Sequence, residues 1–78
     1  MTGPYMDAYH ADEMLKRIRT AEGFLRSAME LAVGLEAEGY VEAINLQREL
    51  EEVLTKLASI KNVSYLRLRR EVAQRVRW

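Results

Sequence analysis

Apolar residues recur along this chain in two runs that have the 3.5-residue spacing of packed helices. Steps of three and four residues alternate through residues 14–35 and again through residues 43–60. The first stripe comprises Met14, Ile18, Ala21, Leu25, Ala28, Ala32 and Leu35, and the second comprises Ala43, Leu46, Leu50, Val53, Leu57 and Ile60. Stripes of this period are typical of helices that pack along their lengths. The sequence therefore predicts an all-α fold.

The positions of proline and glycine divide the chain into helices. The only proline is Pro4, and the segment GLEAEGY, residues 34–40, separates the two stripes. Gly39 suits the left-handed backbone position that follows a helix C-terminus, and Asp7 suits an N-cap. We predict a first helix over about residues 8–38 and a second over 40–61. A link this short makes the two helices antiparallel neighbours, which is a helical hairpin.

The second stripe fails after Ile60, because continuing it turns Ser64, Arg67 and Glu71 inward. A different stripe takes its place, made of Tyr65, Leu68, Val72 and Val76. We predict a third helix over residues 64–77, with Asn62 or Ser64 ending one helix and capping the next. The alternative is one long helix whose packing face shifts.

The chain is short for the amount of apolar surface that it carries. It has 78 residues, of which 49% are hydrophobic, and is expected to form one domain over residues 1–78. A core this thin is commonly completed by self-association. We expect a homo-oligomer, a dimer in the first place, with a monomeric three-helix bundle as the alternative. The expected seam consists of Ile18, Leu25, Ala32, Leu46, Leu50, Val53 and Leu57.

Charge is sorted along the chain although it sums to zero. Residues 30–56 carry seven acids against two bases, a net charge of −5, and residues 57–78 carry six bases against one acid, a net charge of +5. The basic segment has three interpretations: pairing with the acidic second helix, an anionic partner, or a membrane surface. The expected partner-binding residues are Arg67, Arg69, Arg70, Arg75, Arg77 and Trp78, with Tyr5 and Tyr9 as a second patch.

A protein is the favoured partner, and a nucleic acid or nucleotide is the alternative. The neutral total charge and the acidic middle of the chain oppose general binding to duplex DNA, because the first gives no overall attraction to phosphate and the second repels it. The spacing fits neither a helix-turn-helix nor a zinc finger. If DNA is bound, a dimer that presents paired C-terminal helices is the expected geometry.

Catalytic and metal chemistry find little support in these residues. The chain has no cysteine and one histidine, His10, which shares a predicted helical face with Asp7 and Glu13. Neither a nucleophile paired with a base nor a glycine-rich phosphate loop is visible. We expect no enzyme activity, no metal and no cofactor. No apolar run approaches the roughly 20 residues of a membrane span, and we expect a cytoplasmic protein.

In size, helicity and lack of catalytic groups, the chain resembles two broad kinds of protein. One comprises small helical-hairpin regulators that dimerise into four-helix bundles, such as plasmid RNA-binding modulators. The other comprises compact viral inhibitors that phages use against host systems, including anti-CRISPR and anti-signalling proteins. The resemblance covers architecture and carries over no residue. It implies a small, non-enzymatic regulator or inhibitor, for example a phage-type anti-defence inhibitor.

Overall fold

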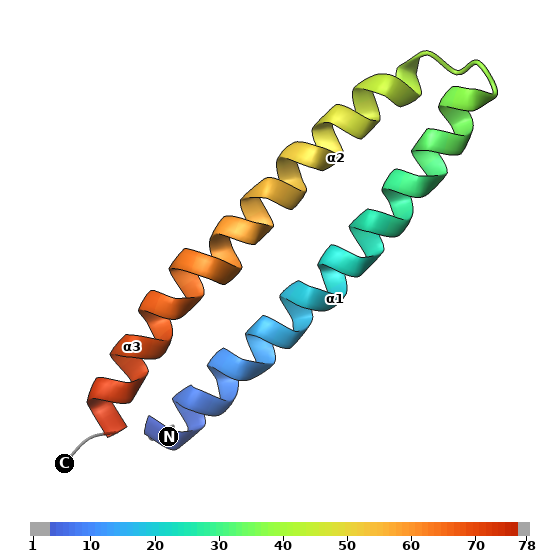
Figure 1. Cartoon of the computed structure of the whole chain (residues 1–78). Helices are drawn as coiled ribbons and strands as arrows, with labels where there is room; N and C mark the ends of the chain where they lie inside the picture. The colour runs from blue at the N-terminus through green and yellow to red at the C-terminus, as the bar shows by residue number, and fades with distance from the viewer. Residues whose placement is uncertain (1–3, 77–78) are drawn as a thin grey trace.

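The chain folds into an antiparallel helical hairpin. The computed structural model describes the backbone of residues 4–76 and the side chains of residues 6–75. Helix α1 (Pro4–Ala37) runs the length of the molecule, and helix α2 (Glu42–Ser59), the π-helical turn η1 (Ile60–Ser64) and helix α3 (Tyr65–Val76) return alongside it (Figure 1). The rod measures 61 by 18 by 15 Å. The predicted all-α hairpin with a shorter C-terminal helix is confirmed.

Helix α1 begins earlier than the sequence pattern predicts. It starts at Pro4, whose fixed φ and missing N–H are tolerated in the first turn of a helix. The prediction of Asp7 as an N-cap is therefore wrong, because Asp7 already lies within the first turn. Its carboxylate there interacts favourably with the positive end of the helix dipole.

The turn between α1 and α2 is a Schellman motif built on Gly39. The N–H of Tyr40 donates to the carbonyl of Leu35 at 3.1 Å, and the N–H of Gly39 donates to the carbonyl of Glu36 at 2.9 Å. Gly39 has a φ of 100°, in the left-handed region that residues with a Cβ rarely adopt. The predicted role of Gly39 is confirmed.

The chain does not break between α2 and α3. Neither Asn62 nor Ser64 caps a helix, so the predicted break is wrong, and the alternative of one continuous rod with a shifted packing face is what the structure adopts (Figure 1). A π-turn takes up one more residue than an α-turn, which rotates the following helix. The rotation brings Tyr65, Leu68 and Val72 against α1.

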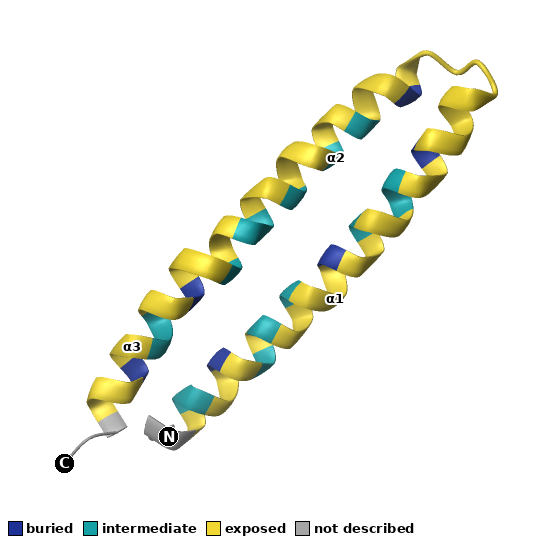
Figure 2. Cartoon of the chain, viewed as in Figure 1, coloured by how far each residue is buried: buried dark blue, intermediate teal, exposed yellow. Residues whose placement is uncertain are grey.

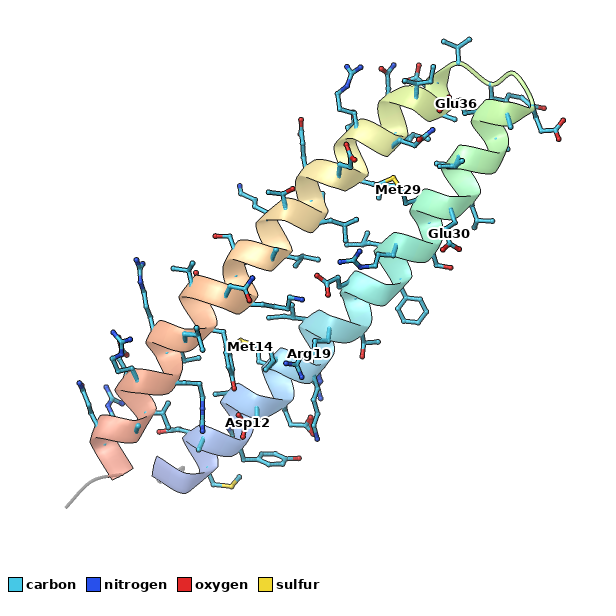
Figure 3. The ribbon with its side chains drawn as sticks, in the orientation of Figure 1. Asp12, Met14, Arg19, Met29, Glu30 and Glu36 are labelled. Carbon is cyan, nitrogen blue, oxygen red and sulfur yellow. The ribbon has the colours of Figure 1, made fainter. Side chains whose placement is uncertain are left out.

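The hairpin core is one side chain thick. Figure 2 shows the buried residues where α1 faces the returning helices α2 and α3. The buried apolar residues are Ala11, Ala32, Ala43, Tyr65 and Val72. Half-buried side chains, including Leu15, Ile18, Leu25, Met29, Leu50, Leu54 and Leu57, fill the space between them. Met29 lies between the helices in Figure 3. No large side chain in the described part of the chain is fully buried.

The inner line of each helix differs from the expected seam by a small rotation. Ile18, Leu25 and Ala32 lie on the inner line of α1, together with Leu15 and Met29. In α2, Leu50, Leu54 and Leu57 face inward. Packing Leu15, Met29 and Leu54 inward removes more apolar area from water than packing Ala21 and Val53 there. Ala28 of the expected stripe is half-buried at the edge of the core.

Two members of the expected seam lie outside the hairpin core. Leu46 and Val53 remain exposed on the surface of the single chain, so assigning them to its core is wrong. Their expected part in contacts between copies is a separate question.

Candidate functional site

The four arginines of α3, Arg67, Arg69, Arg70 and Arg75, lie at the open end of the hairpin, beside the first half of α1. Because η1 and α3 continue the direction of α2, α3 extends away from the acidic residues of α2 and packs against α1 (Figure 1). Among the described residues, one ion pair joins an α3 arginine to another helix, between Arg69 and Asp12 at 3.7 Å. Pairing with the acidic second helix of the same chain does not occur among the described residues.

Asp12 ties α3 to α1. The hydroxyl of Tyr65 donates a hydrogen bond to Asp12 Oδ1 at 2.8 Å, and the same oxygen faces Arg69. Burial, reinforced by the hydrogen bond to Asp12, raises the pKa of the Tyr65 hydroxyl above its usual range. Arg69 is therefore half-buried and already paired, and it contributes more to the joint between helices than to a free binding surface.

Arg67 and Arg70 project from the outer side of α3 and are exposed. Val63 lies four residues before Arg67, Leu66 lies four residues before Arg70, and both are also exposed. We call Val63, Leu66, Arg67 and Arg70 the outer patch. Arginine is enriched at protein interfaces, whose fully buried centre is more apolar than the rest of the surface.

A groove of about 320 Å³ opens between α3 and the first turns of α1. It is lined by Asp7, His10, Ala11, Met14, Leu68, Glu71, Val72 and Arg75. The carboxylates of Asp7 and Glu71 offset the guanidinium group of Arg75, so this groove does not select a simple anion. Arg75 itself is exposed at its rim.

Tyr9 is exposed next to this groove. Its ring packs against His10 at a centroid separation of 5.8 Å and a tilt of 58°, and its hydroxyl donates to Glu13 at 3.3 Å. The side chain of Tyr5, Arg77 and Trp78 lie outside the described residues. The structure therefore brings Tyr9 to the same end of the rod as Arg67, Arg70 and Arg75, without placing it in the outer patch.

Sequence reasoning missed two features of this region. Val63 and Leu66 fall off the stripe of Tyr65, Leu68 and Val72, and that departure was a signal of exposed apolar residues. It also missed Glu22, which is buried on the inner line of α1, because an acid at an apolar spacing reads as part of a solvated face.

Glu22 is buried because it is paired. Lys61 donates to Glu22 Oε1 at 2.7 Å, and Arg26 lies 3.7 Å from the other carboxylate oxygen. The hydrogen bond from Lys61 outweighs the opposing effect of burial, and the nearby positive charges add to it, so the pKa of Glu22 is lowered. A carboxylate held ionised by two cations is suited to joining helices rather than to proton transfer.

Neither a metal site nor a membrane-spanning helix is found among the described residues. No three His, Asp or Glu side chains come together there in a way that holds a metal ion. No helix in that part of the chain has the length and apolar character needed to cross a membrane.

Comparison with known proteins gives no family assignment. No protein-family model, no curated protein and no solved structure matches the chain.

Proposed function

We propose that this protein is a non-enzymatic helical interaction module, a small regulator or inhibitor acting in the cytoplasm. It self-associates through its apolar surface and binds an acidic region of a partner protein through the outer patch. The observation that carries the second part is the juxtaposition of exposed Val63 and Leu66 with exposed Arg67 and Arg70. Such a surface combines apolar contact with guanidinium groups that recognise carboxylates.

Self-association is supported by the surface that one hairpin leaves in water. The chain exposes 6311 Å², whereas a compact monomer of 9.1 kDa exposes roughly 4,900 Å². The excess is of the order that one partner buries in a standard interface, roughly 800 Å² or more. A rod without a fully buried large side chain in its described part has apolar area left for a second molecule.

A protein partner is favoured over a nucleic acid by the aliphatic half of the outer patch. Phosphate contacts need cations and hydrogen-bond donors, and they leave Val63 and Leu66 without a role. The nucleic-acid alternative is supported by Arg67 and Arg70, which are both exposed on the outer side of one helix. It is opposed by the net charge of −5 that the other end of the same rod carries.

A pair of matched double variants tests partner binding. Arg67→Ala with Arg70→Ala removes two exposed cations from the outer patch, and Arg48→Ala with Lys56→Ala removes two exposed cations from α2. The immobilised wild type and both variants are compared for the proteins that they retain from a host extract. We expect a retained protein to be lost with the first variant and kept with the control. Equal retention by both variants contradicts the outer patch.

Leu66→Ser separates the two partner classes. Loss of the apolar contact should weaken binding to a protein at least tenfold, while binding of RNA or DNA through phosphates should stay within a factor of two. Titrations with RNA and DNA at low salt complete the test. A nucleic-acid complex that dissociates steeply with salt and ignores Leu66→Ser would replace the protein-partner proposal with the alternative.

A further inference from the structure

One long face of the hairpin is lined by apolar residues from both helices. They repeat every seven residues, as Met14, Ala21, Ala28 and Leu35 on α1 and Leu46, Val53 and Ile60 on α2. We call these seven residues the apolar face. The five larger side chains keep between 37% and 48% of their area exposed. Phe24 and Leu31, exposed by 73% and 71%, extend the face along the outer edge of α1.

Helix geometry puts the α1 residues and the α2 residues of the apolar face on the same side of the hairpin. Apart from Leu35 beside the turn, each residue of the apolar face directly precedes a buried or half-buried residue, for example Leu15 after Met14 and Leu54 after Val53. In an antiparallel pair, equivalent positions of the two helices point to the same side. A groove of about 680 Å³ lies there; Met14, Ile18 and Ala21 of α1 and Leu57 of α2 form its apolar lining, and Tyr9, His10, Glu13 and Arg17 form its polar lining.

The opposite side of the rod has a different chemistry. Asp12, Arg19 and Arg26 occupy the corresponding positions of α1, and the contacts of Asp12 with α3 lie there. Asp12 and Arg19 are labelled on α1 in Figure 3. Val33 and Ile44, near the turn, are large exposed apolar residues of this side, and Glu51 separates Ile44 from Ala58 at the same heptad position of α2. A continuous line of apolar residues from both α1 and α2 is therefore found on the side of the apolar face and not on the opposite side.

We infer that a second copy of this chain covers the apolar face, with the two rods running in opposite directions. The inference rests on the self-association in the proposed function and adds its surface and its geometry. The face runs along α1 from Met14 to Leu35, about 32 Å at 1.5 Å per residue. The hairpin exposes 6311 Å² against roughly 4,900 Å² for a compact monomer of its mass, and this surplus exceeds the roughly 800 Å² that each partner buries in a standard interface. Covering it with an identical face gives a closed, two-fold symmetric four-helix arrangement.

The distribution of charge along the hairpin favours two copies that run in opposite directions. The turn end of the rod belongs to residues 30–56, with a net charge of −5, and the open end holds the described residues 57–76, with five bases against one acid and a net charge of +4. Rods that run in the same direction place like charges over each other at both ends. Rods that run in opposite directions place the basic end of each copy over the acidic end of the other, and complementarity of this kind fixes orientation.

The small side chains of the face agree with this arrangement. Ala21 and Ala28 lie near the middle of α1, where the two copies of α1 cross the two-fold axis. Alanine at a helix contact lets the axes approach to about 8 Å, the short end of the usual range. The outer patches then lie at opposite ends of the dimer, which presents two binding sites about one rod length apart.

Spin labels on single cysteines test the direction, because the chain has no cysteine of its own. Glu38→Cys puts a label at the turn end, and Thr20→Cys puts one near the middle of α1, both at exposed positions. We expect the two Glu38→Cys labels of a dimer to be separated by about the rod length, 61 Å. The Thr20→Cys labels should lie within about 30 Å, because packed helix axes are about 8–10 Å apart. Short separations for both positions overturn the opposed orientation.

A matched pair of valine variants tests the surface. Val53→Glu and Val33→Glu place the same charge at positions that are exposed by 45% and 51%, on the apolar face and on the opposite side. Because both valines are already in contact with water in the single chain, both variants should keep the helical signal. We expect Val53→Glu to raise the dimer dissociation constant at least tenfold, and Val33→Glu to change it less than threefold.

The outcomes distinguish the inference from the proposed function. Light scattering of the wild type is measured at 100 µM, roughly the upper range of dissociation constants for a weak complex. The mass of a monomer at this concentration would exclude both the proposed dimer and self-association. If Val53→Glu leaves the dimer intact and Val33→Glu dissociates it, the apolar face is not the dimer interface, but self-association still holds. Partner binding through the outer patch is measured separately and is not affected by either result.

Discussion

Lys61 of the π-turn donates a hydrogen bond of 2.7 Å to Glu22 in the middle of α1. The Glu22 side chain is 12% exposed and occupies a position on the inner line that an apolar residue would otherwise fill. Burying an acid is unfavourable unless it is paired, so the contact constrains which turn of the returning rod lies opposite Glu22. The pair therefore favours one register of the hairpin over slipped alternatives.

The Glu22–Lys61 pair should make stability fall in acid. The lowered pKa of Glu22 means that the folded state binds this proton more weakly than the unfolded state, whose value is close to 4.5. The contribution of the pair is complete above that value and is lost as the pH falls through the lowered one. Urea unfolding midpoints measured from about pH 6 to pH 3 should drop more steeply for the wild type than for Glu22→Gln.

The control for this experiment is Glu52→Gln, which removes an exposed carboxylate from α2. Its pH dependence should follow that of the wild type. If Glu22→Gln and the wild type have parallel curves, Glu22 and Lys61 do not interact in solution as they do in the structure.

Tyr65→Phe should loosen the joint between α3 and α1. It removes the hydroxyl that donates to Asp12 while keeping the ring in place. Asp12 is largely exposed and regains water, so the free energy of unfolding should fall by about 0.5–1 kcal/mol. The raised pKa of Tyr65 adds a pH signature, since its contribution is complete below pH 10.0 and is lost as the pH rises through the folded value. A variant as stable as the wild type at pH 7 would rule out this contact.

The same substitution at two glycines should have opposite effects. Gly39→Ala forces a Cβ into a left-handed conformation with a φ of 100° and should cost about 1–2 kcal/mol. Gly23→Ala lies within α1, where an added Cβ meets no atom within 4 Å, and should gain about 0.5–1 kcal/mol. Thermal melts of both variants provide the measurement. A stabilised Gly39→Ala would mean that the Schellman turn is not formed.

Two leucines of α2 separate folding from association. Leu50 is half-buried against α1, so Leu50→Asp should lower the free energy of unfolding by about 2 kcal/mol or more. Leu46 lies on the apolar face and is exposed, so Leu46→Asp should keep its helicity at 25 °C and lose self-association. Circular dichroism with light scattering measures both properties. Equal loss of helicity in the two variants would contradict the assignment of their faces.

The helices and their turn were predictable because each depends on neighbouring residues. One proline at Pro4 leaves the rest of the chain open to helix, and Gly39 supplies the conformation that ends α1. The inward stripe of Tyr65 and Val72 was also visible, since a change of stripe is a local pattern. The outer patch was predictable only in part, because Arg67 and Arg70 follow from composition, whereas the role of Leu66 depends on which side of α3 meets α1.

The sequence by itself determined an all-helical chain, the site of its reversal and a band of apolar residues along each helix. Only the tertiary structure decided which part of each band faces the other helix, because the bands are wider than the contact between two helices and periodicity does not distinguish their edges. It also decided that α3 continues the rod, since a π-turn at Ile60–Ser64 absorbs the change of stripe without ending the helix. Long-range pairing, as between Glu22 and Lys61, links residues that no local pattern relates.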